Sequence, residues 1–189
     1  MKKVLVIGGA GYIGSHTLKI LKEAGYSATV FDDLSSGHKE AVQQTKLIVG
    51  GIDDKKLLSE VMKEEKIDAV LHFAGKIEVG ESMKNPLKYF KNNCLDSVNI
   101  ILAMIENGIK NFIFSSTAAV YGEPLKIPIT EAEKTLPSNP YGLSKLMFED
   151  VLKYYGSQKL INYVSLRYFN AAGADIDGDL GADHKNKTH

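Results

Sequence analysis

A tyrosine, a lysine and a threonine of this 189-residue chain have the types and spacing needed to move a proton. Tyr141 and Lys145 are four residues apart in a segment that opens with the helix-cap candidates Ser138 and Asn139, so both side chains would share one helical face. Thr117 ends a run of β-branched and aromatic residues that predicts a strand. Because ligands bind at the carboxyl edge of such sheets, we predict that the Thr117 hydroxyl emerges there.

The chemistry of the pair depends on the pKa of the tyrosine. A side chain with a pKa of about 10 is a poor base at neutral pH, and lowering that pKa to about 7 requires about 4 kcal/mol. A cation about 5 Å away, at an effective dielectric constant of about 20, supplies about 3 kcal/mol of this. We therefore expect Lys145 to lower the pKa of Tyr141. Since solvated helix faces also carry such pairs, the pair is informative only together with the next motif.

A glycine-rich turn follows the first apolar run, with glycines at Gly8, Gly9, Gly11 and Gly14. This spacing permits a tight turn from strand to helix, close approach of backbone N–H groups to a pyrophosphate, and close packing of the helix on the strand. Asp32 comes 18 residues after Gly14, at the end of the next apolar run. A carboxylate there accepts hydrogen bonds from ribose hydroxyls and repels a 2′-phosphate, which predicts NAD rather than NADP. A purely structural turn is the alternative.

The elements that must position these residues alternate between strand-like and helix-like patterns. Short apolar runs predict strands at Val4–Ile7, Ala28–Phe31, Leu47–Val49, Ala69–Phe73, Phe112–Ser115 and Tyr163–Leu166. Helices are predicted from Tyr12 to a stop at Gly25, over Lys55–Glu65, over Pro86–Glu106, and over Pro140–Tyr155 with a stop at Gly156. Strands separated by helix-length segments predict an α/β fold with a doubly wound parallel sheet, a Rossmann-like NAD-binding domain.

The composition is that of an ordinary globular protein. The chain has 23 Lys+Arg against 23 Asp+Glu and 44% hydrophobic residues, so its charge gives no reason to expect a nucleic acid or an anionic membrane as partner. The single cysteine, Cys94, can form neither an intramolecular disulfide nor a Cys-rich metal site, which favours a cytoplasmic location. No apolar stretch approaches the roughly 18 residues of a membrane span, and no metal site is predicted.

The motifs together resemble the extended short-chain dehydrogenase/reductase superfamily, and within it the UDP-glucose 4-epimerase family. The similar segments are Gly8–His16, His72–Gly75, Val79–Ser82, Pro86–Asn93, Phe114–Gly122 and Leu166–Asn170. They follow one another in family order along nearly the whole chain. The resemblance implies an isomerase of carbohydrate metabolism that uses NAD to epimerise a UDP-hexose at C4 through a 4-keto sugar. It also suggests a homodimer as a hypothesis.

The resemblance assigns roles to individual residues. It makes Tyr141 the catalytic base, Thr117 its hydrogen-bonding helper and Lys145 the residue that binds the nicotinamide ribose. Cofactor contacts are implied for Gly8, Gly11, Tyr12, Ile13, Gly14, Asp32, Ile52, Phe73, Ala74, Gly75, Asn92, Ser115, Tyr141, Lys145 and Tyr168. Substrate contacts are implied for Thr117, Tyr141 and Asn170, the last on the diphosphate side.

Two positions depart from the family's pattern. Gly51 stands where the family commonly has an aspartate that contacts adenine, so adenine would be bound more weakly or through backbone groups and Ile52. Ile77 stands where many members have a lysine that touches the nicotinamide ribose, and Lys76 lies beside it. Neither departure removes the catalytic set.

The polar, glycine-rich stretch Ala171–His189 predicts a domain boundary. Residues 1–170 are expected to form the NAD-binding domain with the catalytic tyrosine and lysine, and residues 171–189 the start of a substrate domain that is missing from this chain. The chain would then be an incomplete form, and an NAD-binding module that is inactive on its own is the alternative. A dehydratase is disfavoured because such enzymes place Asp-Glu where this chain has Ala118-Ala119. A uronate epimerase or decarboxylase stays open.

Overall fold

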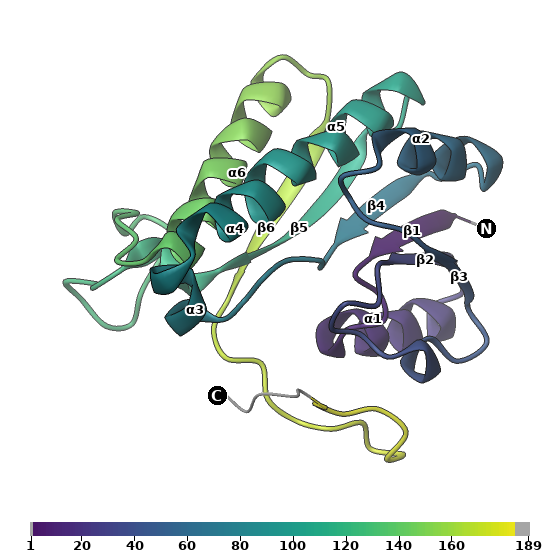
Figure 1. Ribbon diagram of the computed structural model, residues 1–189, viewed down its shortest axis with the longest axis horizontal. Helices are drawn as coiled ribbons and strands as arrows, with labels where there is room; N and C mark the ends of the chain where they lie inside the picture. Colours follow the sequence, from purple (N-terminus) through teal and green to yellow (C-terminus); the bar gives the residue numbers. More distant parts are fainter. Residues whose placement is uncertain (1, 184–189) are drawn as a thin grey trace.

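The computed structural model describes residues 2–183, which are built around one sheet (Figure 1); residues 184–189 of the predicted tail lie outside the described residues. The strands are β1 (Lys3–Ile7), β2 (Ser27–Asp32), β3 (Lys46–Val49), β4 (Ala69–His72), β5 (Asn111–Thr117) and β6 (Asn162–Tyr168). Their order is β3-β2-β1-β4-β5-β6, and every neighbouring pair is parallel. The predicted α/β fold with a doubly wound sheet is confirmed.

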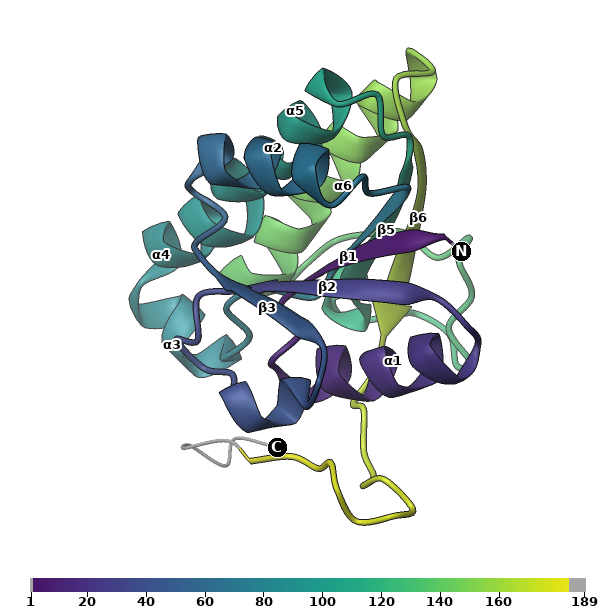
Figure 2. The same cartoon turned by 90° about the vertical axis from the view of Figure 1, so that its right-hand side faces the viewer.

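Helices cover both faces of the sheet (Figure 2). One face carries α1 (Tyr12–Glu23), and the other carries α2 (Lys55–Glu64), α5 (Ser97–Glu106) and α6 (Pro140–Ser157). Two short helices, α3 (Val79–Lys84) and α4 (Pro86–Phe90), precede α5. Among residues 2–183, no helix is both long enough and apolar enough to cross a membrane.

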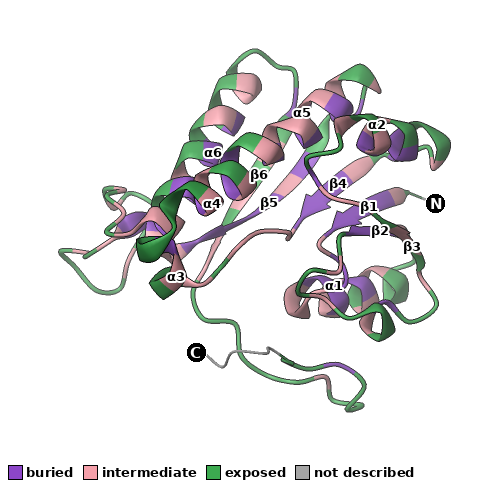
Figure 3. Ribbon diagram, in the orientation of Figure 1, coloured by how far each residue is buried: buried purple, intermediate pink, exposed green. Residues whose placement is uncertain are grey.

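The larger core lies between the sheet and α2, α5 and α6. Its centre is aromatic: Phe148 of α6 packs edge-on against Phe114 of β5, with ring centres 4.9 Å apart. A smaller cluster that includes Val6, Leu18 and Val30 lies under α1. Because both clusters take residues from β1, this strand is buried on both faces, as its unbroken apolar run predicts (Figure 3).

The structure differs from the predicted helices at two places. The helix predicted over Pro86–Glu106 is interrupted by a π-helical segment, Lys91–Asp96, and this segment buries the consecutive residues Asn93 and Cys94. Helix α6 continues past the predicted stop at Gly156 to Ser157. The glycine instead gives room to a neighbour, since a Cβ there would lie 2.6 Å from the Tyr163 ring. Gly25, with φ of +78°, does follow the end of α1 as predicted.

The stretch after β6 contains no helix or strand up to residue 183 and runs back towards α1 (Figure 1). The Tyr12 hydroxyl donates a hydrogen bond to the Gly173 carbonyl at 2.6 Å. The Lys19 ammonium contacts the carboxylates of Asp175 and Asp177 at 2.7 and 2.5 Å. The described part of the tail is therefore attached to α1 through polar contacts.

We expect Phe148→Ala to lower the free energy of unfolding by about 3–5 kcal/mol, because it leaves a cavity in the aromatic centre of the larger core. Phe169→Ala is the matched control, since that ring is 67% exposed, and it should change the stability by less than about 1 kcal/mol. Urea titration of both variants checks this. Equal effects would contradict the described core.

Candidate active site

The predicted site residues follow the carboxyl ends of the parallel strands. Gly8 follows β1, Asp32 ends β2, Phe73 follows β4, Thr117 ends β5 and Tyr168 ends β6. The strand order reverses between β1 and β4, which is where ligands bind in open α/β sheets. One edge of the sheet therefore gathers the residues that the sequence had placed far apart.

The glycine-rich turn allows close approach of the backbone. A Cβ at Gly8, where φ is +79°, would lie 2.3 Å from the Ala74 amide nitrogen, and a Cβ at Gly14 would lie 2.2 Å from the Gly8 carbonyl oxygen. At Gly11 the nearest atom would be 3.4 Å away, so the turn is open on that side. Helix α1 begins there with neither a side-chain cap nor an acidic residue in its first turn. Its N–H groups and positive dipole end can therefore receive a pyrophosphate.

Asp32 is buried, with 7% of its surface exposed, and its carboxylate is hydrogen-bonded to the glycine-rich turn and to the loop after β2. Its two carboxylate oxygens accept hydrogen bonds from the N–H groups of Ala10 and Leu34, both at 2.9 Å. Burial raises the pKa of Asp32, and these two hydrogen bonds oppose the rise. Since a carboxylate oxygen has more than one acceptor site, each can still accept a ribose hydroxyl.

At Gly51, where the family commonly has an aspartate that contacts adenine, the carboxylate of another residue lies in the vacant space. A Cβ at Gly51 would lie 2.3 Å from the Oδ1 atom of Asp53, so the Asp53 carboxylate covers the position from which an aspartate side chain would start. Asp53 is not among the predicted site residues, although an acid two residues after the expected position is a visible signal in the sequence. Ile52 is 7% exposed and packs in the larger core, which leaves mainly its backbone for a ligand.

The loop after β4 is tied to β1 and to α6. The N–H groups of Phe73 and Ala74 both donate to the Ile7 carbonyl, at 2.7 and 3.1 Å. A Cβ at Gly75 would lie 3.0 Å from the Lys145 Nζ atom and 3.1 Å from the Asn93 Oδ1 atom. Because Gly75 has no side chain, the Lys145 ammonium can lie directly against this loop.

Asn93, which the sequence analysis did not select, organises this region. Its Oδ1 atom accepts a hydrogen bond from the Lys76 N–H at 2.8 Å, and its Nδ2 atom donates to the Ser144 hydroxyl at 3.0 Å. The Lys76 ammonium reaches the Ser35 hydroxyl at 3.2 Å, across the loop that follows β2. The neighbouring Asn92, which was selected, has a buried Oδ1 atom with no hydrogen-bond partner within residues 2–183.

The side chains of Thr117 and Tyr141 lie within hydrogen-bond reach of each other. The Thr117 Oγ1 atom accepts a hydrogen bond from the Ala119 N–H at 3.1 Å, where β5 passes into a short 3₁₀ turn. The side chain of Asn139 caps α6 by accepting a hydrogen bond from the Gly142 N–H at 2.8 Å, which sets Tyr141 in the first turn. Burial raises the pKa of Tyr141, and a hydrogen bond between the hydroxyls of Thr117 and Tyr141 lowers it.

Lys145 is almost completely buried, with 3% of its surface exposed. Its ammonium donates a hydrogen bond to the Ser115 carbonyl at 3.1 Å and lies 4.9 Å from the centre of the Phe114 ring. Burial lowers the pKa of Lys145 to about 8. Burial and the Lys145 charge together hold the pKa of His72 well below its ordinary value, so this histidine is neutral at neutral pH.

The expectation that Lys145 lowers the pKa of Tyr141 needs correction. The pKa of Tyr141 is raised, and burial outweighs the only opposing influence, the Thr117 hydrogen bond. The physical reason is the direction of the lysine, whose ammonium faces the Ser115 carbonyl and the Phe114 ring. In this arrangement each of the two groups is pushed towards its neutral form by its own burial.

The remaining predicted residues lie around this centre. Tyr168 is the register partner of Thr117, and burial raises its pKa. Asn170 is exposed beyond the end of β6, and Ile13 is partly buried in the first turn of α1. Among the residues that the structure describes, no group of three or more His, Cys, Asp or Glu side chains could hold a metal ion.

Comparisons with known proteins agree with this geometry. The profile of the NAD dependent epimerase/dehydratase family matches residues 4–187. The chain is 48% identical over 187 residues to a UDP-glucose 4-epimerase of Lacticaseibacillus casei, covering 98% of this chain and 56% of the relative. It superposes with a TM-score of 0.98 and 46% identity on the crystal structure of UDP-glucose 4-epimerase from Brucella ovis in complex with NAD, covering 100% of this chain and 58% of that one.

A second solved structure, UDP-glucose 4-epimerase from Bifidobacterium longum in complex with NAD+ and UDP, gives a TM-score of 0.92 at 39% identity. The match covers 98% of this chain and 58% of that chain. The chain therefore spans a little over half the length of the relatives that it matches.

We expect Lys145→Met to stabilise the fold at pH 7. Below about pH 8 the lysine is charged in both states, and the folded state carries the full cost of burying it; a fall in pKa from 10.5 to about 8 corresponds to about 3 kcal/mol. Between about pH 8 and 10.5 the unfolded state binds more protons, so the free energy of unfolding of the unaltered chain rises with pH.

The variant should therefore be about 1–3 kcal/mol more stable at pH 7, and this difference should shrink as the pH approaches 10.5. Urea unfolding at pH 7 and pH 9 measures it. Lys153→Met, which removes an exposed lysine of the same helix, is the control and should show no such dependence. A Lys145→Met gain that is equal at both pH values would refute the assigned cause.

Proposed function

The chain belongs to the NAD dependent epimerase/dehydratase family, and from this premise we propose that it serves the NAD-dependent epimerisation of a UDP-hexose at C4, between UDP-galactose and UDP-glucose. The observation that carries the proposal is the contact between Thr117 and Tyr141, one helical turn from Lys145 and on the same sheet edge as the glycine-rich turn. The 48% identity to a UDP-glucose 4-epimerase supports it. Residues 1–170 would form the NAD-binding domain, and the stretch from 171 a separate unit.

NAD fits the residues at this edge. The open side of Gly11 and the uncapped start of α1 would hold the pyrophosphate. Asp32 would hold the adenosine ribose through its remaining acceptor sites, and its charge would oppose a 2′-phosphate. Lys145 would bind the nicotinamide ribose. When bound, NAD supplies the group that takes up a hydride from C4 of the sugar and returns it.

Tyr141 would move the other hydrogen, as the base that takes the proton of the 4-hydroxyl and later gives it back. The hydrogen bond with Thr117 favours the phenolate, because it stabilises the charged form. Lys145, with a pKa of about 8, is mostly protonated at neutral pH. The lysine can therefore donate hydrogen bonds to a ribose and add a positive charge to the site.

A second candidate is an NAD-binding module that is inactive on its own. It is favoured by the exposure of the substrate side, where Phe169 and Asn170 lie open to solvent in the described structure. A dehydratase lacks support because Ala118 and Ala119 supply no acid after Thr117. A uronate epimerase or decarboxylase would use the same base, Tyr141. The UDP-sugar that the protein accepts distinguishes these activities from epimerisation of a UDP-hexose.

We further propose a homodimer formed through α4, the π-helical segment and α6, which pack against one another. Large apolar side chains remain exposed on these elements: Leu87, Leu95, Leu143, Met147 and Tyr154. Exposed apolar side chains gathered on adjoining elements are typical of protein interfaces. The single, buried Cys94 supports a cytoplasmic location, and the neutral charge balance supports a small-molecule substrate over a nucleic acid.

Cofactor choice tests the role of Asp32. The unaltered chain should bind NAD at least tenfold more tightly than NADP, a difference of about 1.4 kcal/mol. Asp32→Asn should narrow the gap, because the amide keeps the shape and removes the charge that repels a 2′-phosphate. Asp33→Asn, at the exposed neighbour, is the control and should leave the ratio unchanged. Equal calorimetric affinities of the unaltered chain for both cofactors would refute the assignment.

Turnover tests the role of Tyr141. We expect Tyr141→Phe to lower kcat for the conversion of UDP-galactose by at least about a hundredfold, since the ring stays and the proton-transfer group is lost. NAD affinity should change by less than about threefold. Tyr154→Phe, at an exposed tyrosine of the same helix, is the control.

The turnover assay is run on the chain itself and on a chimera in which the chain replaces the matching part of the Lacticaseibacillus casei relative. If the chimera converts UDP-galactose while the 189-residue chain only binds NAD, the chain is an NAD-binding module that is inactive on its own. An unchanged kcat in Tyr141→Phe would exclude this tyrosine as the base.

A further inference from the structure

Glu149 occupies the third position of the helical face that carries the catalytic pair. It follows Lys145 by four residues and Tyr141 by eight, so the three side chains lie on successive turns of one side of α6. Each of them is bonded to one of three consecutive residues at the end of β5: Tyr141 to the Thr117 hydroxyl, Lys145 to the Ser115 carbonyl, and Glu149 to the Ser116 hydroxyl. The hydrogen bond between Glu149 and the Ser116 hydroxyl has no part in the proposed chemistry.

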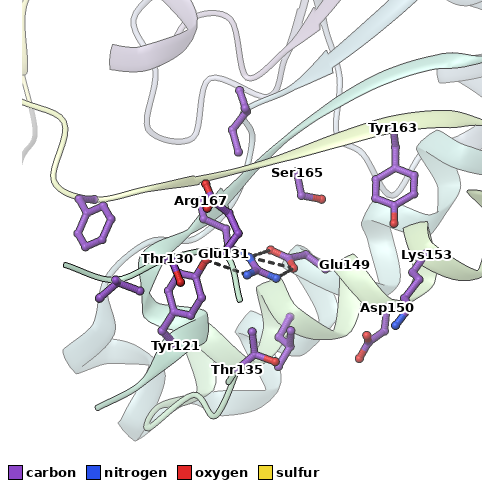
Figure 4. A pocket seen from close by; sticks show the side chains of 14 residues that line it. Tyr121, Thr130, Glu131, Thr135, Glu149, Asp150, Lys153, Tyr163, Ser165 and Arg167 are labelled. Atoms are coloured by element: carbon purple, nitrogen blue, oxygen red, sulfur yellow. Dashed lines mark hydrogen bonds and ion pairs between the residues drawn. The ribbon is translucent and has the colours of Figure 1, made fainter. Parts of the chain in front are cut away.

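The Glu149 carboxylate is the most heavily bonded of the three groups, and it is 8% exposed. The Arg167 guanidinium donates to both of its oxygens, with the Nη2 atom 2.6 Å from Oε2 and the Nε atom 3.1 Å from Oε1 (Figure 4). The Arg167 Nη1 atom also donates to the Tyr121 hydroxyl at 2.9 Å. The carboxylate and this hydroxyl together raise the pKa of Arg167, so it is a permanent cation.

These bonds connect the elements that bear the predicted site. Ser116 and Arg167 are register partners on β5 and β6, directly before Thr117 and Tyr168. Glu149 receives hydrogen bonds from both, so it fixes α6 to two neighbouring strands at once. An ion pair of this kind adds little stability over apolar side chains of the same size, but it has a strict geometry.

We propose that Glu149 is a positioning residue, which holds α6 on β5 and β6 in the one register that brings Tyr141 to Thr117. The inference rests on the proposed function in one respect, namely that Tyr141 is the base. The Thr117–Tyr141 attachment is one hydrogen bond between neutral groups, and the Lys145 attachment uses the ammonium that would bind the ribose. The Glu149 attachment is the charged one that stays available throughout the reaction.

The distance involved suits this role. Eight residues of helix span about 12 Å, and a helix moves as a rigid rod over that length. A small rotation or slide of α6 at Glu149 is therefore carried to Tyr141. Proton transfer requires the two hydroxyls to stay within hydrogen-bond reach, and a misplacement of about 1 Å can lower the rate about a hundredfold.

The decisive variant is the double substitution Glu149→Leu with Arg167→Met. It removes both charges and keeps the volume, so the fold should survive. The midpoint of urea unfolding should stay close to that of the unaltered chain, because the gain from removing the ion pair is offset by the hydroxyls of Ser116 and Tyr121 losing their partners. The single variant Glu149→Ala leaves the partly buried Arg167 guanidinium without its carboxylate partner, so a loss of stability in this variant would report the unpaired charge and not the register. Asp150→Asn is the matched control, because it removes a carboxylate from the adjacent, exposed position of α6.

Two readouts are compared between the double variant and the control. The first is the pKa of Tyr141 in the 189-residue chain, followed by NMR of ¹³C-labelled tyrosine and assigned with Tyr141→Phe. Loss of the register weakens the Thr117 hydrogen bond, so this pKa should rise by about 0.5 to 1 in the double variant and stay constant in Asp150→Asn. The second is turnover of UDP-galactose, where kcat should fall about ten- to a hundredfold with KM within about threefold.

The two readouts separate the two claims. If no protein containing the chain epimerises UDP-galactose, the proposed function fails, and the pKa of Tyr141 still decides whether Glu149 sets the register. A folded double variant with an unchanged pKa of Tyr141 overturns the proposal. An unchanged kcat for UDP-galactose in a folded double variant also overturns the proposal.

Discussion

Direct contacts between backbones hold together the carboxyl edge of the parallel strands. The backbone turns that leave β1, β2 and β4 all meet there, and they are hydrogen-bonded to each other's strands: the Gly8 N–H donates to the Phe31 carbonyl, and the Phe73 N–H donates to the Ile7 carbonyl. Such contacts require backbones to touch. A Cβ at Gly8 or Gly14 would lie only 2.3 or 2.2 Å from a backbone atom, so these contacts between backbones require glycine at both positions.

Burial disfavours the charged form of three ionisable groups at this edge. It raises the pKa of Asp32 and of Tyr141, and it lowers the pKa of Lys145. Each group is therefore moved towards its neutral form and away from the charge that its proposed role requires. The aromatic core beneath, with Phe148 at its centre, offsets the unfavourable burial.

Much of this arrangement could be predicted from the sequence, because strands buried on both faces have unbroken apolar runs. All six strands and the cap at Asn139 lie where the pattern indicates. The short helix α3 and the π-helical segment were missed, since six residues of mixed character carry no readable period. Asn93 and Glu149 were missed for another reason: their importance comes from which atoms meet across the fold, and spacing along the chain does not encode that.

The end of β5 illustrates how much one short segment must do. Consecutive residues of a strand face opposite sides of the sheet, yet Ser115, Ser116 and Thr117 are all bonded to α6. This is feasible because they use different groups. Ser115 accepts the Lys145 hydrogen bond with its backbone carbonyl, and Ser116 points its hydroxyl directly at the helix. Thr117 stands where the strand ends and the chain turns, so its side chain is released from the alternation. Hydroxyl side chains are needed only at Ser116 and Thr117, and a larger side chain at Ser116 would displace Glu149 from the strand.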